Sequence, residues 1–332
     1  MSPHATQPLY FDCDTGVDDS LALGHLLAST AIELVGVGTV SGNVAAAQGA
    51  RNTLDLLALA GADNVPVAIG ANDPLARAYH GGVPHIHGAN GVGNIDLPRS
   101  PKNPVASSAS ELLISLSLEY PGELSILAVG PLTNLALALR LDPSLPSRIR
   151  DVTIMGGAAL VPGNVSAVAE ANIGNDPEAA AEVLAAGWNI TLVPLDVTHE
   201  NILEESQRQA LEDAPHPLVH NLGRILDFYF DFQDGFYGRR ASSLHDPLAA
   251  AIATGSITPT LAPRVNITVD TTGGPGRGQT ICDLRGQRLG PVDQPGANTR
   301  VVLATDTPLG PVLVQQLLAF PSAAVATGQR QH

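Results

Sequence analysis

The stretch LYFDCDTGVDD, residues 9–19, places a short apolar run directly before a group of carboxylates. The run from Leu9 to Asp12 is typical of a buried strand, and the residues from Ser20 to Ser29 then follow a helical spacing. A strand followed by an acidic turn and a helix forms the first half of a βαβ unit. The stretch therefore predicts a parallel sheet with a functional loop at the end of its first strand.

The rest of the chain repeats this alternation of strands and helices. Further strands are expected at Ile32 to Val40, Leu124 to Val129, Val152 to Met155 and Ile190 to Leu195. Helices are expected between them, at Asn43 to Ala60, Leu132 to Leu139 and Pro177 to Ala186. This pattern predicts an α/β fold: an open, mostly parallel, Rossmann-like sheet flanked by helices, with the active site at the carboxyl ends of its strands. We expect one large domain over residues 8–320, with flexible tails at 1–7 and 321–332.

The composition argues against several classes of partner. Among 332 residues, 32 are Asp or Glu and 17 are Lys or Arg, which gives a formal net charge of −15. Such a surface repels phosphate backbones and anionic lipids, so neither nucleic acid nor a membrane is an expected partner. We find no signal peptide and no membrane-spanning segment. Two cysteines, Cys13 and Cys282, form no disulfide framework, so we expect a cytoplasmic protein, and we predict a homodimer or homotetramer.

Four aspartates lie within eight positions: Asp12, Asp14, Asp18 and Asp19. A helix N-terminus can use one or two of them as caps, but four unscreened carboxylates repel one another. A bound divalent cation removes that repulsion, and carboxylate oxygens favour Ca²⁺ or Mg²⁺ over zinc. The sequence therefore predicts a metal site at the end of the first strand.

Two alternatives use the same acidic loop differently. Residues 12–15 resemble the acidic motif of the haloacid-dehalogenase-like phosphatases, which implies a Mg²⁺ enzyme with Asp12 as the nucleophile. Such an enzyme also needs a downstream cation beside the phosphorylated aspartate, and the single lysine, Lys102, lies in a proline-rich loop that we expect to be exposed. The other alternative is a non-catalytic nucleoside- or ribose-binding protein in which the metal is only structural.

Residues 12–19 resemble more closely the amino-terminal signature of the nucleoside hydrolases, the inosine/uridine-preferring family. Further motifs agree in order: Thr39 to Asn43, Val129 to Asn134, Met155 to Asn172, Val197 to His199 and His245 to Pro247. The resemblance spans Pro8 to Phe320. It implies a glycosidase that hydrolyses the N-glycosidic bond of ribonucleosides, with uridine or inosine as substrate, in purine and pyrimidine salvage.

The resemblance also implies a metal centre. Its cofactor is Ca²⁺, and the implied ligands are Asp14, Asp19, Asp246 and the Val129 carbonyl. A metal ion activates water by lowering its pKa, and the resemblance makes Asp14 the general base for that water, with Asn43 helping to hold it. Direct attack by water predicts inversion at the anomeric carbon.

The ribose contacts follow from the same resemblance. Asp18 and Asn172 are expected to bind the 2′- and 3′-hydroxyls, and Asn164 and Glu170 the 5′-hydroxyl. Carboxylates and amides suit this task because they hydrogen-bond well to hydroxyl groups.

The departing base needs a proton, which histidine can supply near neutral pH. His245, next to Asp246, is the first choice, and His87, in the irregular loop from Tyr79 to Asn103, is the second. Both resemble base-proximal histidines of the family.

Three other residues are expected near the base. Met155 is expected to pack beside it, because a thioether fills gaps well. An aromatic cluster at residues 228–237 is expected to serve mainly as core or interface, with Tyr229 and Tyr237 as its candidates for base contact. Ala171 stands where purine-accepting members often carry an aromatic ring, which points away from a strict purine preference.

Overall fold

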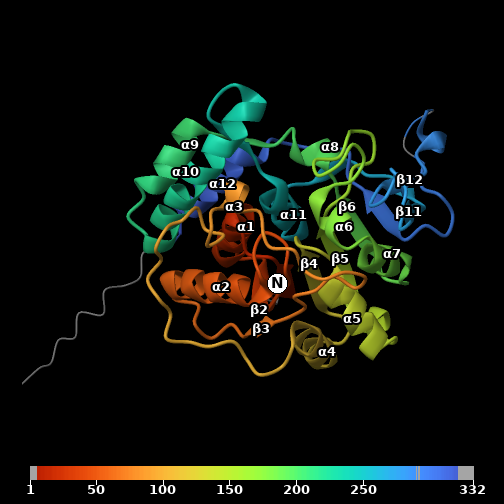
Figure 1. Ribbon diagram of the computed structural model, residues 1–332, viewed down its shortest axis with the longest axis horizontal. Helices are drawn as coiled ribbons and strands as arrows, with labels where there is room; N and C mark the ends of the chain where they lie inside the picture. The colour runs from red at the N-terminus through yellow and green to blue at the C-terminus, as the bar shows by residue number, and fades with distance from the viewer. Residues whose placement is uncertain (1–5, 289, 291, 321–332) are drawn as a thin grey trace, which may run out of the picture.

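A computed structural model describes residues 6–288, 290 and 292–320 and is built on one central sheet (Figure 1). Its eight strands run, from edge to edge, β10 (Arg264–Val265), β13 (Thr299–Val301), β6 (Ile190–Val193), β5 (Ile149–Met155), β4 (Leu124–Ala128), β1 (Gln7–Cys13), β2 (Ile32–Thr39) and β3 (Val67–Ile69). Neighbouring strands are parallel except at the edge, where β10 pairs antiparallel with β13. This arrangement confirms the expected fold class.

The longer helices cover both faces of the sheet. They are α1 (Val17–Ala28), α2 (Ala46–Ala60), α4 (Ala109–Glu119), α5 (Thr133–Leu141), α7 (Pro177–Ala185), α9 (Glu205–Glu212), α10 (Pro217–Tyr237), α11 (His245–Ala253) and α12 (Leu309–Leu318). Three single-turn helices, α3 (Pro84–His87), α6 (Ala171–Asn175) and α8 (Leu195–Thr198), lie in the loops. Among the described residues, none of these helices is both long and apolar enough to cross a bilayer.

Alternation along β1 divides the core into two layers. Leu9, Phe11 and Cys13 are fully buried with α1, α2, α10, α11 and α12, whereas Tyr10 is buried on the other face with α4, α5 and α7. Successive side chains of a strand point to opposite faces, so Cys13 points away from Asp12. It is a buried free thiol.

Three pairs of short strands lie outside the main sheet. They are β7 (Ile202–Glu204) with β8 (Ala241–Ser243), β9 (Pro259–Leu261) with β14 (Ala304–Thr305), and β11 (Ile267–Val269) with β12 (Thr280–Cys282). The β11–β12 hairpin (residues 267–282) lies beside α7 (Figure 1).

Several element boundaries differ from the sequence-based expectation. The strand expected to reach Leu195 ends at Val193, because Pro194 follows and α8 begins at Leu195. Gly61 ends α2 in the left-handed region at φ 72°, as its position suggests, but the helix begins only at Ala46, so Asn43 lies in a loop. Gln7, placed in the N-terminal tail by the sequence, is the first residue of β1; residues 1–5 and 321–332 lie outside the described part.

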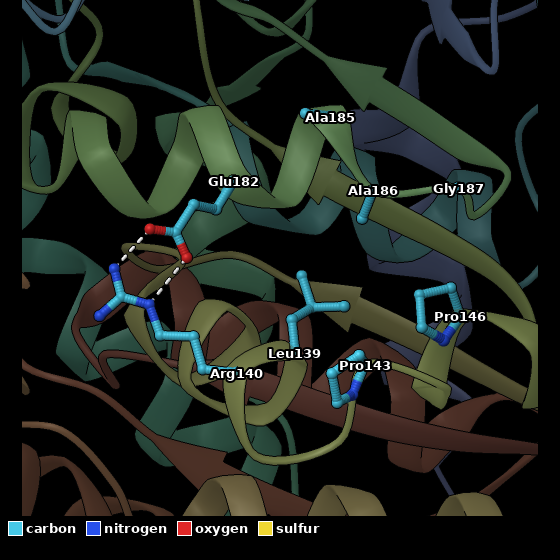
Figure 2. Close-up of a pocket in the computed structure, with 8 residues that line it drawn as sticks. All are labelled: Leu139, Arg140, Pro143, Pro146, Glu182, Ala185, Ala186 and Gly187. Atoms are coloured by element: carbon cyan, nitrogen blue, oxygen red, sulfur yellow. Dashed lines mark hydrogen bonds and ion pairs between the residues drawn. The ribbon is translucent and has the colours of Figure 1, made fainter.

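A surface hollow opens at the C-terminal ends of α5 and α7 (Figure 2). Of the residues lining it, the charged ones are Arg140 and Glu182, and their side chains bind each other, with Arg140 Nε 2.9 Å from Glu182 Oε2. Helix α5 begins shortly after the carboxyl end of β4, and α7 ends shortly before the first residue of β6, so the C-terminal ends of both helices lie away from the carboxyl edge of the sheet. The hollow is therefore remote from the acidic loop, and the charges of this pair balance each other.

Candidate active site

Five buried carboxylates converge at the carboxyl edge of the sheet. Asp14, Asp18 and Asp19 follow β1, Glu170 precedes α6, and Asp246 lies in the first turn of α11; each is at most 8% exposed. Burial raises the pKa of Asp246, and the charges of the other four carboxylates raise it further. Residues more than two hundred positions apart therefore share one acidic pocket.

The tightest part of this pocket consists of Asp18, Asp19 and Asp246. One carboxylate oxygen from each lies within 4.8 Å of the others. Asp18 Oδ1 is buried without a hydrogen-bond partner among the described residues, and so is Asp14 Oδ1 nearby. The resemblance implied Asp14, Asp19 and Asp246 as the aspartate ligands of the metal. The group that lies together here has Asp18 in place of Asp14.

Asp19 is fixed by the start of α1. Its Oδ1 accepts a hydrogen bond from the backbone N–H of Asp14 at 3.0 Å, and its Oδ2 accepts one from that of Gly16 at 2.8 Å. A side chain at Gly16 has no room, because a Cβ there falls 2.5 Å from His87 Nδ1 and 2.6 Å from Asn43 Nδ2. The turn that caps the helix therefore also orients a carboxylate of the pocket.

Asn43 links two members of the cluster. Its backbone N–H donates to Asp14 Oδ2 at 2.6 Å, and its side-chain Nδ2 donates to Asp19 Oδ2 at 3.0 Å. Asp14 is thus held through one oxygen, while its other oxygen, Oδ1, is the unpartnered one.

Asp12 lies outside this group. Its carboxylate accepts hydrogen bonds from the Tyr10 hydroxyl at 2.9 Å and from Asn134 Nδ2 at 3.0 Å, and it is fully buried. Burial raises the pKa of Asp12 to about 7, although both hydrogen bonds lower it. A side chain enclosed in this way cannot attack a phosphate, so the structure gives no support to the phosphatase alternative, and Lys102 is exposed as expected.

Asn172 joins the ends of β4 and β5. Its Nδ2 donates to the Val129 carbonyl at 2.8 Å and to the Met155 carbonyl at 3.1 Å, and it lies 3.4 Å from Met155 Sδ. The amide therefore offers its oxygen, Oδ1, to a ligand. The Val129 carbonyl, a predicted metal ligand, already accepts this one hydrogen bond, which leaves its second lone pair.

Glu170 is the N-cap of α6. Its Oε1 accepts from the backbone N–H of Asn172 at 2.8 Å, and its Oε2 accepts from those of Gly157 at 2.9 Å and Ile173 at 3.1 Å. These bonds lower the pKa of Glu170, but burial dominates and raises it. Asn164 is exposed, and its Oδ1 accepts from the backbone N–H of Ala171 at 2.9 Å, which places it at the edge of the same turn.

His87 is brought to the pocket by α3. Its Nδ1 accepts the backbone N–H of Val17, the first residue of α1, at 3.0 Å, so the proton of the neutral ring is on Nε2. The imidazole stacks on Tyr229 of α10, with ring centroids 5.4 Å apart and 29° between the planes. The loop predicted from Tyr79 to Asn103 therefore contains a residue that packs firmly beside the acidic cluster.

His245 is held from α8. Its Nδ1 lies 2.8 Å from the Thr198 hydroxyl, and its ring meets that of His199 edge-on at 5.4 Å. Burial lowers the pKa of His245 to about 3, and burial also lowers the pKa of His87 to about 3. Thr198 lies in a motif that we singled out, but nothing in the sequence indicated this contact with His245.

The two tyrosines that were candidates for base contact, Tyr229 and Tyr237, lie in different surroundings. Tyr229 is buried and its ring stacks on that of His87, and its pKa is raised first by burial and then by the charges of Asp18 and Asp246. Tyr237 is half-buried and its hydroxyl lies 2.5 Å from Ser243 Oγ, at the end of β8. Only Tyr229 is thus linked directly to the pocket.

Positive charge is scarce around these carboxylates. Among the described residues, no Lys or Arg forms a salt bridge with any of the five carboxylates. The basic side chain beside them is His87, whose Nδ1 lies 3.8 Å from Asp18 Oδ1. Buried carboxylates without a counter-ion are costly. The unpartnered oxygens and the hard oxygen donor set therefore fit a divalent cation.

Known proteins are similar to this chain in sequence and in fold. A family model described as inosine-uridine preferring nucleoside hydrolase matches residues 9–309. The chain is 39% identical to uridine nucleosidase 1 of Arabidopsis thaliana over 250 residues, 73% of this chain and 72% of that protein. It is 35% identical to the inosine-uridine preferring nucleoside hydrolase of Leishmania major, over 83% and 88% of the two chains. A solved plant nucleoside hydrolase superposes with a TM-score of 0.88 at 30% identity, covering 96% of this chain and all of that one.

Proposed function

The chain belongs to the inosine-uridine preferring nucleoside hydrolase family, and from this premise we propose that uridine and inosine are its substrates. The reaction is hydrolysis of the N-glycosidic bond of a ribonucleoside to the free base and ribose. The observation that carries the assignment is the buried cluster of Asp14, Asp18, Asp19 and Asp246, two of whose oxygens lack a partner among the described residues. It lies at the carboxyl edge of the sheet, where such folds bind ligands.

The two alternatives are set aside. A phosphatase requires a free nucleophile at Asp12, whose carboxylate is enclosed by Tyr10 and Asn134. A protein that only binds nucleosides does not agree with the relatives that align with this chain over nearly their whole length, because these relatives are named as hydrolases.

Calcium is the cofactor that we propose. Asp14, Asp19, Asp246 and the Val129 carbonyl would hold it, and Asp18 lies close enough to contribute. When bound, such an ion supplies the positive charge that the cluster lacks and makes water more acidic near neutral pH. The hard, all-oxygen donor set favours calcium or magnesium over zinc.

The chain's own groups divide the remaining work. Asp14 is proposed to accept a proton from the attacking water at Oδ1, because Asn43 already occupies its Oδ2. Asp18 and the Asn172 oxygen are proposed to bind the 2′- and 3′-hydroxyls, and Glu170 and Asn164 the 5′-hydroxyl. Contacts that tighten as the ribose ring flattens stabilise the transition state rather than the bound substrate.

The base side of the pocket is assigned to His245, His87 and Tyr229. Thr198 engages Nδ1 of His245, so Nε2 is the ring nitrogen left to assist the departing base. His87 presents its Nε2–H for the same reason, since Val17 engages its Nδ1. Met155, whose Sδ lies 3.4 Å from Asn172 Nδ2, is proposed to pack beside the base, and Tyr237 is a second candidate for base contact.

The test is to incubate the purified protein with uridine, inosine, adenosine and cytidine in calcium buffer and to assay ribose as reducing sugar. We expect ribose from uridine and inosine, loss of turnover after chelation, and recovery when calcium is restored. Asp14→Ala should abolish both turnover and calcium binding. Release of ribose from none of the four nucleosides would refute the proposed function, and binding of intact uridine without turnover would restore the binding-protein alternative.

We also propose that the protein acts in nucleoside salvage in the cytoplasm, as a homodimer or homotetramer. The two free cysteines fit a reducing compartment. Cell fractionation and light scattering of the purified protein test the location and the oligomeric state.

A further inference from the structure

The β11–β12 hairpin contains a buried polar side chain that the proposed chemistry does not use. Thr280, the first residue of β12, is 3% exposed, although the strand lies outside the main sheet. Its hydroxyl accepts the backbone N–H of Ala158 at 2.9 Å and donates to the carbonyl of the same residue at 2.9 Å. One hydroxyl thus satisfies both backbone groups of a residue in the loop after β5.

That loop leads directly to the sugar side of the pocket. Gly157, next to Ala158, donates its backbone N–H to Glu170 Oε2 at 2.9 Å. Gly157 is at φ 80°, where side chains are strained, and a Cβ there would lie 2.8 Å from the Thr280 hydroxyl. Gly157 therefore both packs closely against Thr280 of the hairpin and donates the hydrogen bond to Glu170.

The hairpin is itself anchored, so it can act as a fixed support. Arg277 Nη2 donates to Glu178 Oε2 of α7 at 2.9 Å, and Ile267 and Val269 pack against the core beside that helix. An isolated antiparallel bridge joins Gln279 to Ala169, the residue before Glu170. The hairpin therefore contacts both segments that meet at Glu170: Ala158 through Thr280, and Ala169 through Gln279.

We propose that Thr280 is a positioning residue for ribose recognition: by fixing the Gly157–Ala158 turn, it orients the Glu170 carboxylate toward the 5′-hydroxyl of the nucleoside. This inference rests on the proposed role of Glu170. Thr280 does not touch the substrate; it acts through the backbone N–H that holds one of the two Glu170 oxygens.

The test compares uridine with 5′-deoxyuridine, which lacks the hydroxyl that Glu170 is proposed to bind. The wild-type protein should prefer uridine, measured as the ratio of the two kcat/KM values. Thr280→Val, which keeps the shape but removes the hydroxyl, should lower this ratio about tenfold, mostly by raising KM for uridine. Thr280→Ser should keep the ratio within about twofold, and so should Thr268→Val, a matched change at an exposed threonine on the same hairpin.

Two comparisons separate positioning from general loss of stability. In a Glu170→Gln background the Thr280→Val change should lower the ratio no further, because the contact that it acts through is already altered. Melting temperatures identify variants that fail to fold, and Thr280→Ala replaces Thr280→Val if that one does. An equal loss of kcat/KM on both nucleosides, with the ratio unchanged, would overturn the inference.

Failure of the proposed function has a different outcome. If the wild-type protein releases ribose from none of the four nucleosides, the proposed activity itself is refuted. If it turns over uridine but Glu170→Gln leaves the ratio unchanged, Glu170 does not bind the 5′-hydroxyl and the inference about Thr280 falls with that assignment.

Discussion

Replacing Asp18 with Asn should stabilise the protein in the absence of metal and weaken its response to calcium. Asp18 Oδ1 is buried without a partner among the described residues, and one oxygen of this carboxylate lies within 4.8 Å of those of Asp19 and Asp246. A buried unpartnered group costs about 1–3 kcal/mol when it is neutral and more when it is charged, and the repulsion between like charges, which Asn does not share, adds to the cost of the carboxylate. Neutralising it should therefore raise the free energy of unfolding of the metal-free protein by about 2 kcal/mol.

The assay is thermal unfolding in chelator and in calcium. For a chain of this length the unfolding entropy is about 0.7 kcal/mol per degree, so 2 kcal/mol corresponds to a Tm rise of about 3 °C in chelator. In calcium at a hundred times its Kd, the wild-type protein should gain about 2.7 kcal/mol, or about 4 °C. A tenfold weaker affinity in the variant reduces that gain to about 1.4 kcal/mol, or about 2 °C.

The control is Asp176→Asn. Asp176 is also a fully buried aspartate, but its carboxylate accepts hydrogen bonds from Leu75 N–H, the Thr133 hydroxyl and Ala179 N–H. Its replacement should lower Tm equally in chelator and in calcium. The reasoning would be refuted if Asp18→Asn lowered Tm in chelator as this control does, or if calcium raised the Tm of the variant and the wild type equally.

Three further predictions concern other parts of the molecule. Thr198→Val should lower kcat on uridine about tenfold or more while sparing p-nitrophenyl riboside, whose leaving group needs little help, and Thr198→Ser should keep most activity; equal losses on both substrates would contradict the proposed role of His245. His25 is fully buried and burial lowers its pKa to about 4, so the folded state favours the neutral ring, and stability present above pH 6.5 is lost as the pH falls toward 4. Between pH 7 and pH 5, the free energy of unfolding in urea should fall by about 2 kcal/mol less in His25→Gln than in the wild type. Identical pH profiles for the two proteins would contradict the lowered pKa of His25. The first ribose formed from uridine should be the α anomer by rapid NMR, because water attacks directly; a β product would instead indicate a covalent intermediate.

The sequence predicted the interior of this fold better than its edges. Strands such as Leu124–Ala128 and Ile149–Met155 are long and apolar because helices cover both of their faces, and that signal is local. The strands Val67–Ile69, Arg264–Val265 and Thr299–Val301 were not predicted. Two or three residues are too few to show a period, and their pairing is decided by the neighbouring strand rather than by their own residues.

The residues of the pocket could be predicted from the sequence, but their hydrogen-bond partners could not. The acidic loop itself joined Asp18 to Asp19, and the resemblance to the nucleoside hydrolases grouped Asp19 with Asp246, so all three residues were named before the structure brought them together. The sequence could not indicate that Asp12 bonds to Tyr10 and Asn134, because that depends on which face of β1 meets α5. Contacts such as Thr198 with His245 come from loops whose paths are set by tertiary packing.

The order of strands in the sheet also bears on how the chain is made. Strand β6 lies between β5 and β13, yet more than a hundred residues separate β6 from β13 in the sequence. During synthesis one edge of β6 therefore stays unpaired until residues 299–301 leave the ribosome, and exposed strand edges are templates for aggregation. Asp246 also emerges long after Asp18 and Asp19, so a nascent chain cannot complete the acidic cluster early. The late β13 segment thus covers this edge only when synthesis is nearly complete, and truncations before it should aggregate even though they retain every residue of the acidic cluster.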